Sequence, residues 1–353
     1  MTDLLEIPKY RTVKACKERF VFSVIGLKHS HIYAMCKGML DAGAELKYVY
    51  DDDEQLLKNF LRCFASGFMA KDEEEIFSDC ETQLVLSADI PAKRAALAIR
   101  VMESGKNFFV DKAPVINRKQ LNEVRAEIQR TGMRYFVFYC ERMASECSLF
   151  TDVLIERGAI GKVVNITSFA PHKLGAGRPN WFFNKEDTGG ILIDIGSHQF
   201  EQILHFGNNR TAKILSGTVA NYSHREYVGF EDFGDCHLLG TNGVAGYLRV
   251  DWLTPDNMAT FGDGRLFLIG EKGFIELRKH IDIAYGHNSD TLFLVNENGE
   301  YKISVHGKIG IPYYADIIDD CMQKTKKCDS DLMLSAMELA LDAQQLAETL
   351  SMK

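Results

Sequence analysis

A line of four acidic and basic residues interrupts a segment of the chain that is otherwise apolar. The segment, residues 189–206, reads GGILIDIGSHQFEQILHF and carries Asp194, His198, Glu201 and His205. Their intervals of four, three and four residues place all four side chains on one face of a helix. Histidine has an ordinary pKa of about 6.5, which suits it to take up and release protons at neutral pH. The pattern therefore predicts one helix whose polar face can carry out proton transfer.

Three interpretations of this polar line are open from the sequence. It can be the solvated face of an amphipathic helix. It can be a metal site, because histidines and carboxylates one turn apart can chelate an ion. In the third interpretation His198 is a general base, and Asp194 shares the substrate with it or stabilises its charged form. Periodicity by itself favours the first interpretation and leaves the other two open, and we expect no metal.

Polar and aromatic side chains elsewhere are candidates for binding a substrate near this helix. The stretch PHKLGAGRPNWFF, which precedes the helix, contains His172, Arg178 and Trp181, although a tryptophan here is also typical of a core or a lid. We expect substrate contacts from Arg142, His172, Trp181 and Glu201.

The first part of the chain alternates short apolar strands with amphipathic helices. The predicted strands are RFVFSVIG, ELKYVYD, TQLVLSAD, NFFVD and MRYFVFY. Such alternation is typical of a parallel sheet with helices on both faces. Right-handed crossovers then make it a doubly wound α/β sheet. We expect this domain to span residues 1–140 and to bind a nucleotide.

The first strand ends in a turn where a nucleotide would sit, because the following helix offers free N–H groups to a pyrophosphate. The expected fingerprint is G-x-G-x-x-G, but the chain reads G-L-K-H-S-H from Gly26, so only the first glycine is kept. The residues His29 and His31 of this turn suit polar or nucleotide contacts better than a metal. An ordinary strand-to-helix turn would have the same pattern.

Two charged residues end later strands of this domain. Asp51 follows the second strand, where an acid can accept hydrogen bonds from ribose hydroxyls and repel a 2′-phosphate, which favours NAD over NADP. Lys112 follows the apolar strand FFVD, on the side of the sheet where ligands bind, and can stabilise negative charge on a substrate oxygen. A solvated acidic turn and an exposed loop lysine are the alternatives.

The second part of the chain, residues 141–353, has a different texture. Strand-like runs follow one another, separated by turns: KVVNITSFAP, KILSGTVANY, DFGDCHLLG, VAGYLRVDWL, GRLFLIG, GFIELRK, TLFLVN and YKISV. They predict a large, mainly antiparallel open sheet, with helices in the last forty residues. A sheet with one uncovered face needs a partner surface, so we expect an oligomer.

Composition excludes several classes of function. The net charge of −8 and the lack of a long basic block argue against a nucleic-acid partner. No window holds eighteen consecutive apolar residues, and the N-terminus lacks an apolar signal region, so we expect neither a membrane span nor a signal peptide. The nine cysteines follow no disulfide pattern, which favours buried thiols in the cytoplasm.

Two motifs together resemble the Gfo/Idh/MocA family of nucleotide-dependent oxidoreductases. GKNFFVDKAP and, later, GGILIDIGSHQFE are similar to the family patterns G-K-h-V-x-x-E-K-P and G-G-x-x-x-D-x-G-x-H-x-x-D. The resemblance covers nearly the whole chain and implies an N-terminal Rossmann domain and a C-terminal α/β domain for substrate binding. It also implies that the open sheet of this second domain makes the contacts of a homodimer or homotetramer. It implies that Lys112, Asp194 and His198 are catalytic. The expected cofactor contacts are Gly26, Leu27, Lys28, His29, His31, Asp51, Ser87, Ala88, Asp89, Asp111 and Lys112.

The chain departs from the family pattern at three places. Asp111-Lys112-Ala113-Pro114 displaces the proline by one residue, the glycine turn has lost two glycines, and Glu201 stands for an aspartate. We predict an NAD(H)-dependent dehydrogenase of a sugar, polyol or related cyclic hydroxy compound, with His198 as acid/base. The alternatives are a non-catalytic nucleotide-binding sensor of the same family and a metal-dependent hydrolase.

Overall fold

The computed structural model describes residues 4–15, 17–283 and 289–351, which form two compact units. One unit consists of Arg11–Phe138 and Pro312–Leu334. The other consists of Met1–Tyr10, Tyr139–Ile311 and Ser335–Lys353. The functional division at residue 140 stays a prediction, and each unit is described by itself below.

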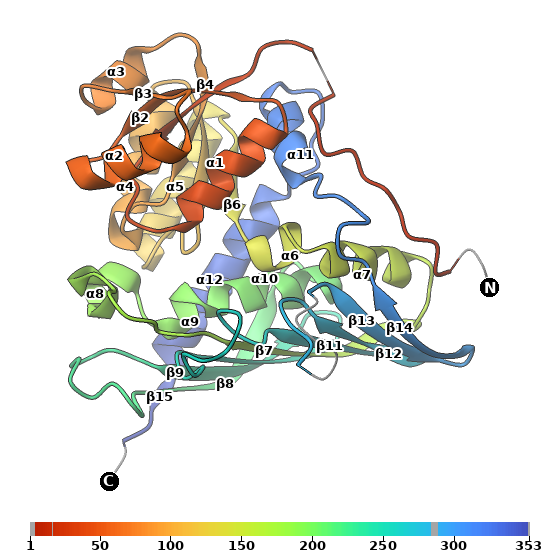
Figure 1. The fold of residues 1–353 in the computed structure, drawn as a ribbon. Coiled ribbons are helices and arrows are strands. Elements are labelled where there is room, and N and C mark those ends of the chain that lie inside the picture. Colours follow the sequence, from red (N-terminus) through yellow and green to blue (C-terminus); the bar gives the residue numbers. More distant parts are fainter. Residues whose placement is uncertain (1–3, 16, 284–288, 352–353) are drawn as a thin grey trace. The chain divides into compact units, whose positions relative to one another are not determined.

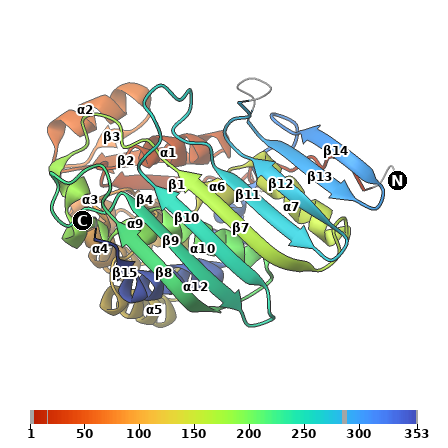
Figure 2. The ribbon, with the colours of Figure 1, turned by 90° about the horizontal axis from the view of Figure 1, so that it is seen from below.

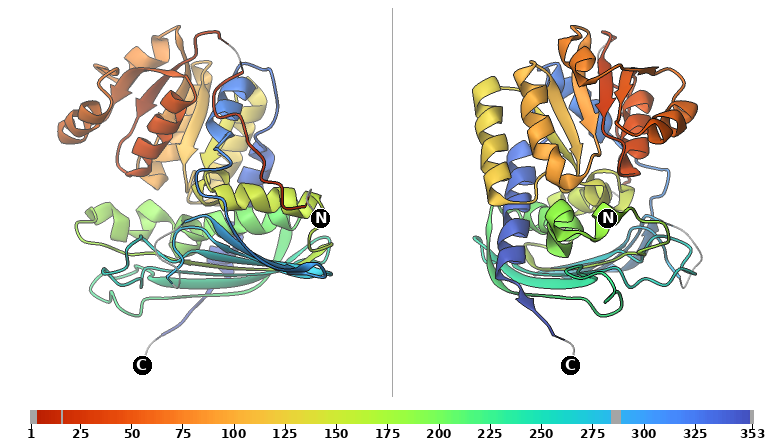
Figure 3. Two further views of the ribbon diagram at one scale, coloured as in Figure 1. Left: turned by 45° about the vertical axis from the view of Figure 1, so that its right-hand side comes forward. Right: turned by 90° about the vertical axis from the view of Figure 1, so that its left-hand side faces the viewer.

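The first unit is built on a six-stranded parallel sheet with strand order β3-β2-β1-β4-β5-β6. Helices lie on both of its faces (Figures 1 and 3). The strands are β1 Val21–Ile25, β2 Glu45–Tyr50, β3 Phe68–Met69, β4 Thr82–Ser87, β5 Asn107–Asp111 and β6 Tyr135–Phe138. The helices are α1 His31–Asp41, α2 Glu54–Cys63, α3 Glu73–Ser78, α4 Pro91–Glu103, α5 Arg118–Thr131 and α11 Tyr313–Cys321. This order is that of a doubly wound Rossmann sheet, so the predicted fold is confirmed.

Local sequence explains where these elements begin and end. All five residues of β1 are buried, as expected for a central parallel strand covered on both faces. The carboxylate of Asp53 accepts hydrogen bonds from the N–H groups of Gln55 and Leu56 and so caps α2. Pro91 occupies the first turn of α4, and Gly132 ends α5 at a φ of +68°. The short elements β3 and α3 were missed by the sequence analysis.

The second unit is built on a nine-stranded sheet with strand order β14-β13-β12-β11-β7-β10-β9-β8-β15. The strands are β7 Val163–Pro171, β8 Ala212–Ala220, β9 Phe233–Gly240, β10 Ala245–Asp251, β11 Arg265–Gly270, β12 Gly273–Arg278, β13 Thr291–Asn296, β14 Gly299–Ser304 and β15 Glu348–Thr349. Most neighbours are antiparallel, but β7 pairs with β10, and β8 with β15, in parallel. All predicted strands of this sheet are present, and β15 is an addition to them.

The helices of this unit gather on one face of its sheet. They are α6 Cys140–Met143, α7 Glu146–Glu156, α8 Lys185–Thr188, α9 Ile191–Asp194 and α10 Gly196–Phe206, with a 3-10 turn η1 at Asn180–Phe183. Helix α12, Ser330–Leu346, has its later residues in this unit. Figure 2 looks onto the opposite face, where the strands are seen without a helix in front of them. The sheet therefore carries its helices, including α10, on one side only.

Two further features of the structure bear on the predictions about membrane spans and cysteines. Within the described residues, no helix combines the length and apolar character that crossing a membrane requires. The eight described cysteines form no disulfide with one another, and the ninth, Cys16, lies outside the described residues.

Close packing at Gly38 in α1 gives a stability prediction. A Cβ atom at this position would lie 2.2 Å from the Cζ atom of the Tyr314 ring, on α11 of the same unit. Alanine is a better helix former than glycine by about 1 kcal/mol, but overpacking against a rigid ring costs about 1–3 kcal/mol. We expect Gly38→Ala to lower the free energy of unfolding in a urea titration.

The matched control is Lys37→Ala, one residue earlier in α1, because its side chain is 69% exposed. A surface change of this kind should alter the free energy of unfolding by less than about 0.5 kcal/mol. An unchanged or higher stability of Gly38→Ala would contradict the predicted clash with Tyr314.

Candidate active site

The polar segment 189–206 forms two helices, so the prediction of one continuous helix is wrong. Helix α9 ends at Asp194 and α10 begins at Gly196, a poor helix former at the junction. Two side chains fix the start of α9: a Glu231 carboxylate oxygen accepts the N–H of Ile191 at 2.9 Å, and Gln344 accepts that of Leu192 at 3.1 Å.

The polar residues of this segment are not a solvated face. His198 is 2% exposed and Glu201 is fully buried. His205 Nε2 lies 2.6 Å from an oxygen of Asp152, on α7. The polar residues of this segment therefore have different surroundings. The interpretation as a solvated amphipathic face is wrong, because His198 and Glu201 are buried.

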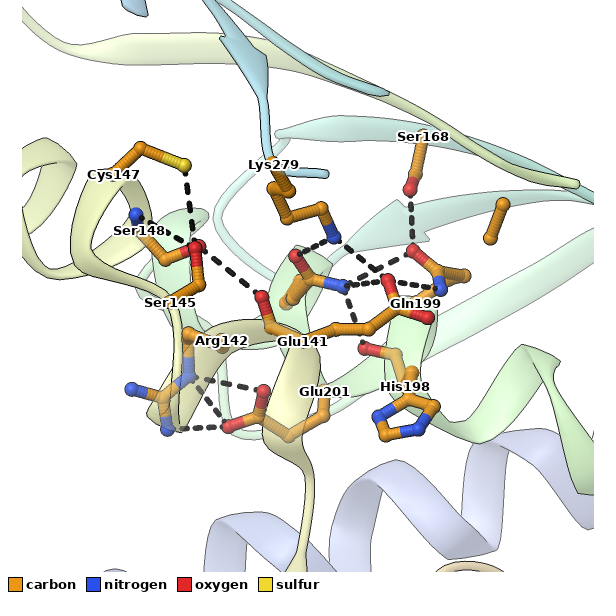
Figure 4. A network of polar contacts seen from close by, with 12 residues as sticks. Glu141, Arg142, Ser145, Cys147, Ser148, Ser168, His198, Gln199, Glu201 and Lys279 are labelled. Atoms are coloured by element: carbon orange, nitrogen blue, oxygen red, sulfur yellow. Dashed lines mark hydrogen bonds and ion pairs between the residues drawn. The ribbon is translucent and has the colours of Figure 1, made fainter. Parts of the chain in front are cut away.

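Glu201 is held by Arg142, which comes from α6. The arginine Nε lies 2.8 and 2.9 Å from the two carboxylate oxygens of Glu201. Arg142 Nη2 adds a third contact to the same carboxylate (Figure 4). Such forked, charge-assisted pairs are strong and fix orientation. The pair ties α6 to α10, and the expected substrate contacts of both residues stay a prediction.

His198 rests on a buried polar network (Figure 4). Its carbonyl oxygen accepts a hydrogen bond from Gln202 Nε2 at 3.2 Å, and its ring meets the Tyr139 ring edge-on, with 5.6 Å between centroids. Gln202 Oε1 in turn accepts a hydrogen bond from Lys279 Nζ at 2.9 Å. The backbone of α10 at His198 is therefore held by side chains that come from α10 itself and from the residue after β12.

An aromatic cluster contains one of the predicted substrate residues. His172 packs against Trp252, with ring centroids 5.5 Å apart, and its Nδ1 lies 3.1 Å from the carbonyl oxygen of Ala170. The guanidinium of Arg178 stacks over the Trp252 ring, 5.3 Å from its centroid. Burial lowers the pKa of Arg178, and the negative charge of Asp194 offsets part of that effect. The charge of Asp194 therefore acts on Arg178, which is part of this aromatic cluster.

Trp181, a second predicted substrate residue, lies in the turn η1. It is half-buried, and its ring meets that of Phe182 edge-on, with 5.9 Å between centroids. Its expected substrate contact stays a prediction.

In the Rossmann unit, two predicted cofactor segments come together. Gly26 has a φ of +88°, and a Cβ atom there would lie 2.6 Å from the Cβ atom of Asp89. The N–H of Ala88 donates to the carbonyl of Gly26 at 3.1 Å, and the N–H of His29 donates to that of Ala88 at 2.9 Å. Only glycine fits this approach. Ser87, buried at the end of β4, leads directly into this turn.

Asp51 braces the altered glycine turn. Its carboxylate accepts the N–H of Leu27 at 2.6 Å and the N–H of Asp53 at 2.8 Å, and it pairs with Lys28 Nζ at 2.7 Å. Burial lowers the pKa of Lys28, but its hydrogen bonds to Asp51 and Asp52 outweigh that effect and raise the pKa to about 12. The lysine that replaces the second glycine therefore stays charged and bound to the two acids.

A cavity of about 400 Å³ opens beside this turn. It lies at the carboxyl ends of β1, β2 and β4, where doubly wound sheets bind nucleotides, and its volume is in the range of small-molecule sites. Its lining residues are Ile25, Gly26, Lys28, Tyr50, Asp51, Asp52, Glu73, Asp89, Lys93, Ala96, Leu97 and Arg100. Four of them are acids and three are bases, so the lining has a formal charge of −1.

Asp111, directly before Lys112, is a buried carboxylate with three charged or polar side-chain partners. It lies 2.8 Å from His31 Nδ1, 3.1 Å from His29 Nδ1 and 3.2 Å from Arg94 Nη2. Burial by itself raises the pKa of Asp111, but the two histidines and the arginine outweigh it and hold the pKa well below its usual range. Burial, helped by His31, lowers the pKa of His29 to about 4.

The sequence analysis missed Arg94, which is almost fully buried in α4. Its Nη1 donates to the carbonyl oxygens of Asp111 and Ala113 at 3.0 Å each, and also to that of Lys112. One guanidinium thus fixes the backbone on both sides of Lys112. The residue has no motif signal, because an arginine in the run PAKRAALAIR is equally typical of an exposed helix face.

Within the described part of the chain, two groups of side chains have the spacing of metal ligands: His29, His31 and Asp111, and Glu146, Asp290 and His306. Arg94 already supplies a positive charge to the first group. The second includes Glu146, whose carboxylate accepts the N–H groups of Ile309 and Gly310 at 2.8 and 2.7 Å. Existing partners therefore compensate an acid in each group.

Comparison with known proteins adds independent information. Residues 152–276 match the GFO/IDH/MocA C-terminal domain. A crystal structure from Erwinia carotovora atroseptica SCRI1043, provisionally described as an oxidoreductase, is 39% identical with a TM-score of 0.92, and the match covers 94% of this chain and 100% of that one.

Two curated proteins are more distant relatives. Scyllo-inositol 2-dehydrogenase (NAD(+)) of Bacillus subtilis (strain 168) is 24% identical over 237 residues, which cover 66% of each protein. D-xylose dehydrogenase of Paenarthrobacter nicotinovorans is 23% identical over 133 residues, which cover 36% of this chain and 34% of that protein. With its Rossmann sheet, its nine-stranded sheet and its matching C-terminal domain, the chain belongs to the Gfo/Idh/MocA family of oxidoreductases.

Proposed function

We propose that this protein is an NAD(H)-dependent dehydrogenase that acts on a carbinol group of a sugar, polyol or related cyclic hydroxy compound. The observation that carries the proposal is the buried His198 of α10, which follows the Asp194 end of α9 and sits on a fixed polar network. The two curated relatives, an inositol dehydrogenase and a xylose dehydrogenase, support the substrate class.

The turn and cavity of the Rossmann unit suit a dinucleotide. The absence of a Cβ atom at Gly26 allows the end of β1 to approach Asp89 closely, at the turn before α1 where this fold binds phosphate. Asp51 ends β2, where a ribose is bound in this fold, and the net negative lining favours a 2′-hydroxyl over a 2′-phosphate. Lys28 must exchange its contact with Asp51 for one to the nucleotide. When bound, NAD supplies the hydride acceptor at nicotinamide C4.

The remaining chemistry belongs to side chains. His198 removes the carbinol proton during oxidation and returns it during reduction. Asp194 orients the hydroxyl and stabilises the imidazolium that forms. Lys112, whose backbone is fixed by Arg94, stabilises negative charge on the reacting oxygen.

We also propose that the protein is a homo-oligomer in the cytoplasm. The support for an oligomer is that some apolar side chains of the open sheet are exposed, including Leu215 at 55% and Ile269 at 45%. The cysteines of the described residues form no disulfide with one another, which is consistent with a reducing compartment.

Replacing His198 tests its role as acid/base. We expect His198→Asn to lower kcat by about 10²–10⁴-fold, because general acid–base catalysis contributes that much, with the affinity for NADH unchanged. The measurement is steady-state oxidation of scyllo-inositol and D-xylose together with an NADH fluorescence titration. The control is His205→Asn on the same helix, whose histidine pairs with Asp152. Normal turnover in His198→Asn would remove this residue from the mechanism.

Replacing Lys112 tests charge stabilisation in a dry site. We expect Lys112→Ala to reduce kcat/KM by about 2–4 kcal/mol in transition-state free energy, as for the loss of one preorganised donor. Lys119→Ala is the control, because Lys119 is 84% exposed on α5 and should leave kcat/KM unchanged. Equal kinetics of the two variants would contradict the proposed role of Lys112.

Replacing Asp51 tests the choice of nucleotide. Without its carboxylate, the ribose loses an acceptor and a 2′-phosphate meets less repulsion, so Asp51→Ala should shift the ratio of NADPH to NADH dissociation constants by about tenfold toward NADPH. Fluorescence titrations with each nucleotide measure this ratio, and the control is Asp41→Ala, because Asp41 is 64% exposed at the end of α1 and does not line the cavity. Tighter binding of NADPH by the unchanged protein would show that Asp51 has been misinterpreted.

A further inference from the structure

The buried carboxylate of Glu141 in α6 is only half satisfied. Its Oε2 accepts hydrogen bonds from Lys279 Nζ at 2.7 Å, Gln199 Nε2 at 2.9 Å and Gln202 Nε2 at 3.4 Å (Figure 4). Its Oε1 is buried as well, yet it accepts no hydrogen bond from any described residue. The residue as a whole is 3% exposed, so bulk water does not solvate this oxygen freely.

The carboxylate is nevertheless ionised. Burial by itself raises the pKa of Glu141, but the positive charge of Lys279 outweighs it, and the pKa lies well below its usual range. A buried, charged oxygen without a donor costs about 1–3 kcal/mol or more. Such atoms in folded proteins commonly bind a ligand or an ordered water, so Oε1 can accept a hydrogen bond from a bound molecule.

A second buried polar atom without a partner belongs to the neighbouring residue of Lys279. His280 Nε2 makes no hydrogen bond within the described part of the chain. Burial, followed by the charge of Lys279, lowers the pKa of His280 to about 4, so the imidazole is neutral at pH 7. A neutral imidazole nitrogen either donates or accepts one hydrogen bond, according to its tautomer.

Both atoms belong to the surroundings of the proposed catalytic histidine. Lys279 has the largest effect in lowering the pKa of Glu141, and the next largest effects come from His198, His172 and His280. The same glutamate acts on His280 in return. All of these residues lie in the unit of the nine-stranded sheet, so the grouping involves that unit alone.

Apolar ring faces complete the cluster. The ring of Phe261 lies 4.5 Å from that of His280 and 5.0 Å from that of His172, measured between centroids. His172 in turn packs against Trp252. Acceptors and donors set among aromatic faces are the usual environment of a bound sugar ring, whose hydroxyls need partners and whose C–H faces need apolar cover.

We propose that Glu141 Oε1 and His280 Nε2 form a binding subsite for hydroxyl groups of a neutral polyhydroxy substrate. The proposal rests on the dehydrogenase function proposed above and specifies its substrate class. Glu141 accepts a hydrogen bond from one substrate hydroxyl, and His280 bonds a second hydroxyl. A substrate carboxylate in this place would meet the ionised Glu141, so the subsite selects neutral polyols over uronic acids.

The decisive variant is Glu141→Gln, which keeps the shape and can keep the acceptor that Lys279 uses, but places an NH₂ donor where Oε1 accepts. His280→Phe is the second variant; it removes the other polar atom and provides the test if Glu141→Gln does not fold. The matched control is Glu276→Gln on β12, whose carboxylate pairs with Arg278. Folding of each variant is checked by circular dichroism.

Each protein is titrated as its NADH complex with scyllo-inositol, D-xylose and D-glucuronate, followed by tryptophan fluorescence, and is assayed for turnover of the same compounds with NAD. We expect both variants to weaken binding of the neutral polyols, and to raise their KM, by tenfold or more. NADH affinity should change by less than twofold, and the control should behave as the unchanged protein. The preference for neutral compounds over D-glucuronate should fall in Glu141→Gln.

The two proposals fail in different ways. Turnover of a neutral polyol with unchanged affinity in both variants would overturn the subsite and leave the dehydrogenase function standing. Polyol binding that the variants weaken, without any turnover, would support the subsite and overturn the dehydrogenase function. No binding of either neutral polyol, or tighter binding of D-glucuronate, would overturn the subsite.

Discussion

An ionised carboxylate inside a protein must be compensated by neighbouring donors, because an uncompensated buried charge costs several kcal/mol. In the Rossmann unit, Asp111 receives Arg94 and two histidines, and the same arginine binds the backbone around Lys112. In the other unit, Glu141 receives Lys279 and two glutamines, one of which also holds the backbone of His198. The donors that compensate Asp111 and Glu141 therefore also hold the segments that carry the proposed catalytic groups.

The same constraint organises segments that lie far apart in the sequence. Glu231 anchors the first N–H of α9, and Gln344 of α12 binds both Glu231 and the next N–H. A side chain at Gly190 would collide with this arrangement, since a Cβ atom there would lie 2.5 Å from the Gln344 amide oxygen. The position of Asp194 at the end of α9 therefore depends on partners about forty and one hundred and fifty residues later in the chain.

Sequence patterns predicted what is encoded locally. Apolar runs located the main strands of both sheets, and motif spacing singled out Lys112, Asp194 and His198, whereas the two-residue strands β3 and β15 are too short for a periodic signal. Periodicity also failed between Asp194 and Gly196, because a spacing of four fits a continuous helix and a broken one equally well. The roles of Arg94 and Lys279 were missed for another reason: their partners are set by the tertiary fold.

The pairing of Glu141 with Lys279 across 138 positions shows what such tertiary pairing contributes to chemistry. Proton uptake by a buried histidine creates a cation, which low polarity disfavours. The negative charge of Glu141 acts on His198 and favours that cation, while Lys279 balances the glutamate when the histidine is neutral. For the proposed acid/base role of His198, this pairing supplies a fixed environment that needs little rearrangement of solvent, as electrostatic preorganisation requires. An exposed histidine on a solvated helix face would lack this preorganisation.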